Sequence, residues 1–205
     1  MELLRTANAG ILLKMDGASI LLDGVCPPYA NYLGTPDELR EQLLQTSPDA
    51  LVFTHRHPDH CDEDFADTFY KNTHRPILWA EDPCPMQIGN LEIIPVPTCH
   101  SGKAEIAHVS YVIKGSLCLW FTGDASPLAR FPKELPRPDV AVVTFAYACR
   151  PNVWKRTKAM GAKKYILLHL PDKAEDPHQL WKAVEETTAG EPNLFIPSIG
   201  ENIVL

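Results

Sequence analysis

The sequence has no excess of positive charge and no closely spaced pair of cysteines. It contains 19 Lys and Arg residues and 26 Asp and Glu residues, which gives a formal net charge of -7. A nucleic-acid partner requires a basic surface that neutralises phosphates, so this balance argues against nucleic-acid binding. The six cysteines form no C-x-x-C motif and do not resemble a disulfide framework. We therefore expect reduced thiols, as in the cytoplasm.

Long apolar runs are also missing. The first 23 residues hold two short apolar runs that are interrupted by Lys14 and Asp16. Both runs are too short for a signal peptide or for a membrane span. We expect no membrane insertion and a cytoplasmic location. Nothing in the sequence indicates an oligomeric state.

The overall composition is that of an ordinary globular protein. Apolar residues make up 45% of the 205 residues and charged residues make up 22%. A chain of this length and composition can bury a sizeable hydrophobic core. No sharp change in composition marks a boundary, so we expect residues 1–205 to form one domain.

The order of the predicted elements occurs twice along the chain. A hairpin comes first in each half, and alternating strands and helices follow it. Thr35 is predicted to cap the first helix, and the last two strands are predicted to lie at sheet edges. The predicted strands are 10–15, 19–23, 49–54, 76–79, 91–95, 109–114, 117–121, 140–144, 165–168, 193–196 and 203–205, and the predicted helices are 35–44, 62–70, 153–160 and 177–188. This pattern indicates two sheets packed face to face with helices outside.

Three histidines and an aspartate follow directly after the predicted strand at 49–54. In an extended segment His55 and His57 point to the same side, so both can bind one ion. Asp59 and His60 lie beyond a proline, where the chain turns and can reach a second ion. Imidazole and carboxylate ligands together suit zinc, iron or manganese.

This run resembles the H-x-H-x-D-H signature of the metallo-β-lactamase superfamily. Further segments resemble that family in the same order along nearly the whole chain; they are Leu21–Gly24, Pro97–Gly102, Phe121–Asp124 and Leu167–Pro171. The resemblance implies an α/β fold, a four-layer αββα sandwich with metal ions at one edge of the two sheets.

The resemblance also implies a set of metal ligands and their roles. Two divalent ions would be held, the first by His55, His57 and His100, the second by Asp59, His60 and His169, with Asp124 as the bridge. Zinc is the metal that we expect, and manganese and iron are the alternatives.

Two further roles follow for aspartates near these ligands. Two ions about 3.5–4 Å apart can share a water and lower its pKa, and Asp59 is then the best candidate to orient that water or to carry its proton. Asp23 would accept a hydrogen bond from a ligating imidazole and fix its tautomer. The alternative for Asp23 is a hairpin-end carboxylate that caps nearby amides.

Three more side chains are candidates for substrate binding. His108 begins a predicted strand, and Tyr147 and Arg150 lie in a loop after the strand at 140–144. An arginine can bind a carboxylate or phosphate with two parallel hydrogen bonds. The alternatives are a half-exposed strand histidine and an ordinary surface arginine.

The sequence is similar to small cytosolic members of the superfamily near the L-ascorbate-6-phosphate lactonase and N-acyl phosphatidylethanolamine phospholipase D branch. It is shorter than these, and Ala125 follows Asp124 where a threonine is common. We predict a binuclear metal-dependent hydrolase that acts on an ester, lactone or phosphodiester small molecule. The alternatives are a mononuclear iron dioxygenase of thiol compounds with the same fold and a non-catalytic metal-binding protein.

Overall fold

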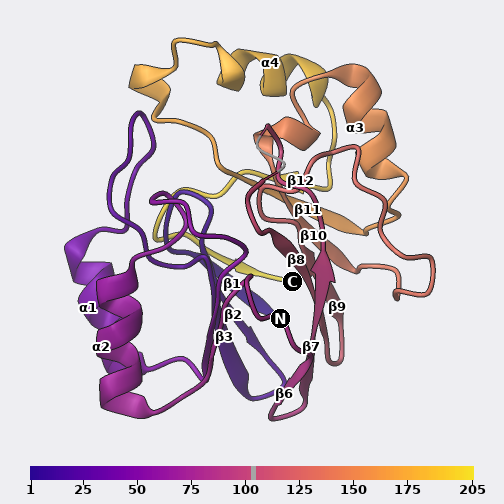
Figure 1. Cartoon of the computed structure of the whole chain (residues 1–205). Coiled ribbons are helices and arrows are strands. Elements are labelled where there is room, and N and C mark those ends of the chain that lie inside the picture. The colour runs from indigo at the N-terminus through magenta and orange to yellow at the C-terminus, as the bar shows by residue number, and fades with distance from the viewer. Residues whose placement is uncertain (103–104) are drawn as a thin grey trace.

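Two β-sheets face each other at the centre of the molecule, and helices lie outside each sheet (Figure 1). The structure is a computed structural model that describes residues 1–102 and 105–205. The first sheet contains β1 (Glu2–Arg5), β2 (Ile11–Met15), β3 (Ala18–Leu22), β4 (Ala50–Val52), β5 (Ile77–Leu78) and β13 (Asn202–Val204). The second contains β6 (Met86–Ile88), β7 (Leu91–Pro97), β8 (Val109–Lys114), β9 (Cys118–Phe121), β10 (Val140–Thr144), β11 (Lys164–Leu168) and β12 (Leu194–Phe195). The α-helices in the described ranges are α1 (Asp37–Thr46), α2 (Glu63–Thr73), α3 (Pro151–Lys158) and α4 (Leu180–Thr187), and the 3₁₀ helices are η1 (Phe145–Tyr147) and η2 (Lys173–Glu175).

Each sheet combines an antiparallel part with a parallel part. The strand order is β13-β1-β2-β3-β4-β5 in the first sheet and β12-β11-β10-β9-β8-β7-β6 in the second. β1, β2 and β3 pair antiparallel, while β3, β4 and β5 pair parallel. Likewise β6 to β9 pair antiparallel, and β9 to β12 pair parallel. The repeated order predicted from the sequence is therefore present.

The core between the sheets is built by strands that are buried on both faces. Val140 and Val142 of β10 point into the central cluster, while Ala141 and Val143 pack in the cluster on the outer face. The same alternation holds for β11. Because both faces are covered, these strands are continuous apolar runs, which is typical of parallel strands in layered folds.

Helices cover the outer face of each sheet and complete four layers. α1 and α2 pack on the first sheet through a cluster that contains Leu43, Phe65 and Phe69. α3 and α4 pack on the second sheet through Trp154 and Val184. Figure 1 shows the two pairs on opposite sides of the sandwich. The predicted αββα layer order is confirmed.

The structure corrects several local predictions. β1 and β6 were not predicted, since each is too short for periodicity to reveal it; β1 pairs with the distant β13, as in Leu3 opposite Ile203. The prediction that Thr35 caps α1 is wrong: Pro36 occupies the cap position, and the Thr35 hydroxyl accepts a hydrogen bond from a backbone amide instead. α4 begins at Leu180 rather than near 177, because Gln179 has a left-handed backbone with φ of 52°.

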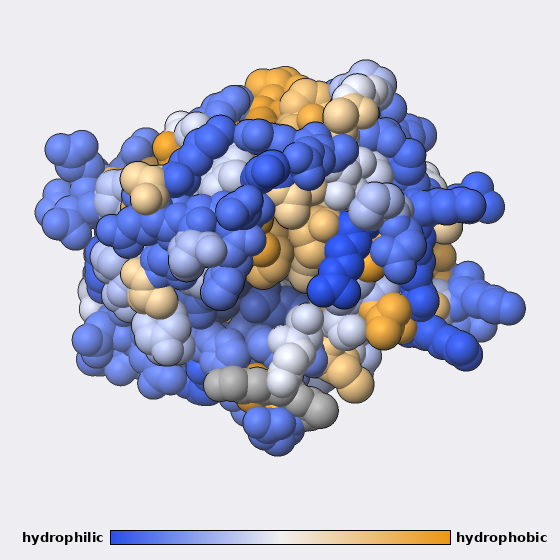
Figure 2. All heavy atoms as spheres, turned by 90° about the horizontal axis from the view of Figure 1, so that it is seen from above, coloured by the Kyte–Doolittle hydropathy of each residue, from blue (hydrophilic) through white to orange (hydrophobic). Residues whose placement is uncertain are grey.

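The surface carries hydrophilic residues over most of the face seen in Figure 2. Hydrophobic residues form separate groups on that face, and it is hollowed near its centre (Figure 2).

Over the described ranges, no helix is long and apolar enough to cross a membrane. The predicted edge strands are confirmed, because β12 and β13 each end a sheet.

Candidate metal centre

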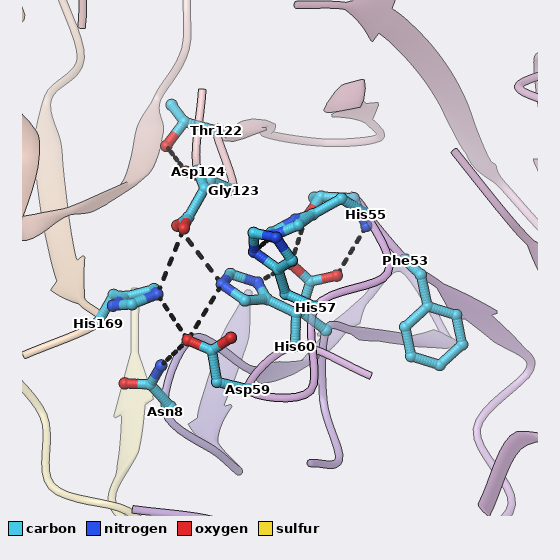
Figure 3. Close-up of polar contacts among 12 residues, drawn as sticks. Asn8, Phe53, His55, His57, Asp59, His60, Thr122, Gly123, Asp124 and His169 are labelled. Atoms are coloured by element: carbon cyan, nitrogen blue, oxygen red, sulfur yellow. Dashed lines mark hydrogen bonds and ion pairs between the residues drawn. The ribbon is translucent and has the colours of Figure 1, made fainter. Parts of the chain in front are cut away.

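The predicted metal ligands lie where strands of both sheets end at a common edge. Asp23 follows β3, and His55 lies three residues past β4. Asp124 and His169 follow β9 and β11 in the second sheet. Parallel strands of a sheet direct their carboxyl ends to one edge, and the sandwich brings the two edges together. Residues far apart in the sequence therefore meet in one polar cluster (Figure 3).

The first group of candidate ligands consists of His55, His57 and His100. Their ligand atoms all lie within 4.8 Å of one another. His55 Nε2 and His57 Nδ1 are 3.0 Å apart, as expected for alternate residues of an extended segment that point to one side. His55 is fully buried and His57 is partly exposed, so His57 marks the solvent side of this group.

The second group consists of Asp59, His60 and His169, whose ligand atoms also lie within 4.8 Å of one another. His169 Nε2 is 3.2 Å from Asp59 Oδ2. The chain turns after His57, where the His57 carbonyl accepts the amide of His60. After this turn Asp59 lies beside His169, while the His60 ring also remains close to the first group, with its centroid 4.1 Å from that of His55 (Figure 3).

Asp124 lies between the two groups. Its Oδ1 is 3.4 Å from His60 Nε2, and its Oδ2 is 3.4 Å from His169 Nε2. The same Oδ2 is 3.6 Å from His100 Nε2. One carboxylate thus faces both groups, as a bridging ligand must.

Backbone pairing fixes Asp124 and His100 relative to each other. His100 forms an isolated antiparallel bridge with Ala125. The amide of Ser101 donates to the Asp124 carbonyl at 2.7 Å, and the amide of Ser126 donates to the Cys99 carbonyl at 2.8 Å. The loops after β7 and β9 therefore present their ligands as a single unit.

Asp23 and Thr54 set the tautomers of two histidines. The Thr54 hydroxyl donates to Asp23 Oδ2 at 2.6 Å, so it can only accept from His55 Nδ1, which is 3.0 Å away. His60 Nδ1 is 2.9 Å from the same Asp23 oxygen. In its neutral form each ring then carries its proton on Nδ1, and Nε2 is directed into the cluster. The structure gives Asp23 the contact with an imidazole that the sequence analysis expected.

The cluster fits a metal because its inner polar atoms make ion-pair contacts but no hydrogen bonds among the described residues. His60 Nε2, Asp124 Oδ1 and His169 Nε2 are buried without a hydrogen bond, with contacts of 3.2–3.4 Å to one another or to neighbouring carboxylate oxygens, and both nitrogens of His100 also lack a hydrogen bond. An unpaired buried nitrogen or oxygen costs roughly 1–3 kcal/mol, so several in one place indicate a missing partner. Imidazole and carboxylate donors in two groups of three with a shared aspartate suit two divalent ions.

The charges of the cluster are strongly coupled. Burial would raise the pKa of Asp124, but His169 and His60 hold it well below its ordinary value. Burial opposes a charge on His169, yet Asp124 and Asp59 raise its pKa to about 9. Asp124 and Asp23 likewise raise the pKa of His60 well above its ordinary value against the effect of burial. By contrast, burial and the neighbouring His60 lower the pKa of His55, whose ring stays neutral.

The three predicted substrate-binding residues lie in different environments. His108 is buried beside the cluster, with its ring centroid 5.2 Å from that of His55. Tyr147 is buried in the outer core, and its hydroxyl donates to the Ser126 carbonyl at 3.4 Å. Arg150 is exposed at the start of α3, and within the described residues no hydrogen bond or ion pair links it to the cluster. The structure thus brings only His108 against the candidate ligands.

Two residues near the cluster were missed by the sequence analysis. Asn8 Nδ2 donates to Asp59 Oδ2 at 3.3 Å, and the Asn8 carbonyl accepts the amide of His169. Tyr32 packs edge-on against His169, with ring centroids 4.6 Å apart. Asn8 is a polar residue between two alanines just before the strand predicted at 10–15, and that position is the signal that could have drawn attention to it. Tyr32 has no such signal in its loop.

Arg5 anchors the loop that contains Asn8. Its guanidinium is buried and donates to the carbonyls of Ala7, Asn8 and Pro197. Burial lowers the pKa of Arg5 to about 10. Because its donors are used by the backbone, Arg5 holds the Asn8 loop in place and is not available to a substrate.

Gly123 should be required for placing Asp124. It has φ of +50°, and a Cβ at this position would lie 2.7 Å from the side chain of Thr54. Gly123→Ala adds both a backbone penalty and a clash, so we expect a loss of about 2–5 kcal/mol in the free energy of unfolding, measured with urea. Gly190→Ala is the matched control, because Gly190 has φ of +78° and open space around it. Equal losses in the two variants would show that contact with Thr54 is unimportant.

Comparisons with known proteins support the fold. No protein-family model and no curated protein sequence matches the chain. Its structure is similar to Igni18, a metallo hydrolase from Ignicoccus hospitalis, with 19% identity, a TM-score of 0.68, and coverage of 98% of this chain and 97% of that one. A possible metal-dependent hydrolase from Veillonella parvula has 16% identity and a TM-score of 0.73 over 100% of this chain and 99% of its own.

A third similar structure carries the name of the fold. YhfI from Bacillus subtilis, a metallo-β-lactamase fold protein, has 18% identity and a TM-score of 0.63, with coverage of 96% of this chain and 91% of that one. These matches extend over nearly the whole length of each protein. Together with the two sheets, their outer helices and the ligand cluster at one edge, they show that this chain has the metallo-β-lactamase fold.

Proposed function

We propose that this chain is a binuclear metal-dependent hydrolase of an ester, lactone or phosphodiester small molecule. The observation that carries the proposal is the position of Asp124 between two groups of three candidate ligands. The similarity to structures named as metal-dependent hydrolases supports it. His55, His57 and His100 would hold one ion, Asp59, His60 and His169 the other, and Asp124 both.

Two divalent ions held by these residues would supply a water of lowered pKa and polarise the oxygen of the bond to be cleaved. Asp59 is the side chain that we expect to orient the attacking water and to take its proton. Asn8 Nδ2 and His169 Nε2 both contact Asp59 Oδ2, so these two side chains help to orient the carboxylate. Zinc is the metal that we propose, since imidazole and carboxylate ligands suit it.

The position of Tyr32 suggests how a substrate is held. Its ring lies against His169, and burial, followed by Asp124 and Asp59, raises the pKa of its hydroxyl to about 12. The hydroxyl therefore remains protonated and can donate to a substrate oxygen beside the second group of ligands. Phe145 lies on the same histidine, with ring centroids 5.8 Å apart, and adds an apolar surface there.

Loading the protein with zinc should release protons at pH 7. His60 and His169 are protonated on both ring nitrogens in the metal-free protein, because their pKa values are raised. One of these nitrogens must lose its proton to bind a metal. We expect release of about two protons per chain, falling as the pH rises through the His169 pKa of about 9. Calorimetry in buffers of different ionisation enthalpy measures this number. Binding without proton release at pH 7 would contradict the assignment of these ligands.

Removal of a proposed ligand should abolish hydrolysis. We expect His57→Ala and Asp124→Ala each to lower kcat/KM by about 100-fold or more and to reduce the metal content, since Asp124 serves both ions. Activated aryl esters, thiolactones and bis-aryl phosphodiesters are suitable substrates. His178→Ala is the control, because His178 is exposed and belongs to neither group of candidate ligands.

The variants also separate the alternatives. If Asp124→Ala left both the metal content and the rate unchanged, the bridging role would be wrong. If the wild-type protein bound metal tightly but hydrolysed none of the three substrate classes, the hydrolase proposal itself would fail.

A further inference from the structure

His108 is a buried histidine that the proposed mechanism leaves without a role. It is 4% exposed and precedes β8, where its carbonyl accepts the amide of Thr98. Its ring lies near two proposed ligands, with centroids 5.2 Å from His55 and 5.8 Å from His100. Its Nε2 is buried and has no hydrogen-bond partner. A buried polar atom without a partner requires an explanation.

A chain of hydroxyl groups determines which nitrogen of His108 carries the proton. The Ser110 hydroxyl donates to the Thr122 carbonyl at 2.8 Å, so it can only accept from Thr98, whose hydroxyl is 3.1 Å away. Thr98 has then used its one proton. It must accept from His108 Nδ1, which is 2.8 Å from the Thr98 oxygen. The neutral His108 ring therefore presents a lone pair, not a proton, at Nε2.

Among the described residues, His100 is the nearby histidine whose donor is free for this lone pair. His55 has committed its Nδ1 proton to Thr54, as shown above. His100 faces Asp124 through Nε2, and its Nδ1 is buried and also without a partner. A neutral histidine that binds a metal through Nε2 carries its proton on Nδ1. His100 thus has a buried donor without an acceptor, and His108 has a buried acceptor without a donor.

We propose that His108 is a positioning residue for His100. When His100 binds a metal ion through Nε2, His108 Nε2 accepts a hydrogen bond from His100 Nδ1. The resulting relay runs from His100 through His108, Thr98 and Ser110 to the Thr122 carbonyl. It gives His100 the support that Asp23 and Thr54 give to His60 and His55. His108 is not one of the side chains whose ligand atoms lie within 4.8 Å of one another, so it acts through His100 rather than as a ligand of the first group.

The first test is zinc affinity in the full-length protein, measured by competition with a chromophoric chelator. His108→Phe fills the space but removes the acceptor, and we expect the affinity of the zinc held by the first group to fall about 10–100-fold, the usual effect of losing such support. His108→Gln retains an acceptor oxygen and a donor, and we expect it to restore most of the affinity. His178→Phe serves as the surface control. Unfolding of each metal-free variant shows whether it is folded.

The second test is nitrogen NMR of the zinc-loaded protein with labelled histidines. We expect His108 to have its proton on Nδ1 and a free Nε2, and we expect the Nδ1 proton of His100 to exchange slowly. In Thr98→Val, which removes the acceptor for His108 while keeping the side-chain shape, the tautomer of His108 should no longer be fixed. This variant carries the test if His108→Phe does not fold.

Three results would overturn the inference. They are unchanged zinc affinity in a folded His108→Phe protein, a proton on His108 Nε2, and a nitrogen shift that shows zinc bound directly to His108 Nε2. The inference rests on metal binding by His100. Absence of zinc binding by the wild-type protein would instead refute the proposed function, so the two failures are distinguishable.

Discussion

The buried carboxylate of Asp23 joins the segments that form the polar edge of this sandwich. It accepts hydrogen bonds from the Thr54 amide, the Thr54 hydroxyl and His60 Nδ1. A buried carboxylate is stable only when such donors surround it. These same donors fix the loop after β4 to the end of β3. The tautomers of two proposed ligands therefore follow from an interaction that the fold itself requires.

Two residues of the candidate site have backbone conformations that non-glycine residues rarely adopt. Asp23 and His169 have positive φ values of 44° and 62°, although neither is a glycine. Such conformations cost about 1–3 kcal/mol and persist where the surrounding structure enforces them. Here the amide of His169 donates to the Asn8 carbonyl, and Arg5 holds that carbonyl in turn. Hydrogen bonds to the Asn8 carbonyl in the loop after β1 thus help to hold His169, a candidate ligand, at the end of β11.

Features that depend on nearby residues could be predicted from the sequence. The first hairpin, with strands at 10–15 and 19–23, the strand at 140–144 and the shared direction of His55 and His57 all follow from spacing of a few residues. The resemblance to a known family added the distant candidate ligands His100 and His169. The layer order followed from the repeated alternation of strands and helices.

What could not be predicted depends on contacts between distant segments. β1 exists because β13 pairs with it, and Asn8 reaches Asp59 only after both sheets have formed. Tyr147 follows β10 as expected, yet its side chain packs in the outer core, because the 3₁₀ turn after the strand directs it there. The direction of a side chain in a loop is set by tertiary packing, which local patterns do not encode.

The central claim is that this edge of the sandwich holds two metal ions bridged by Asp124. The most direct test is the number of metal ions per chain in protein purified without chelators, measured by elemental mass spectrometry against an accurate protein concentration. The account predicts close to two ions, with zinc as the main metal. One iron per chain would contradict the binuclear centre and favour oxygen chemistry, and no metal after zinc has been offered would contradict the claim outright.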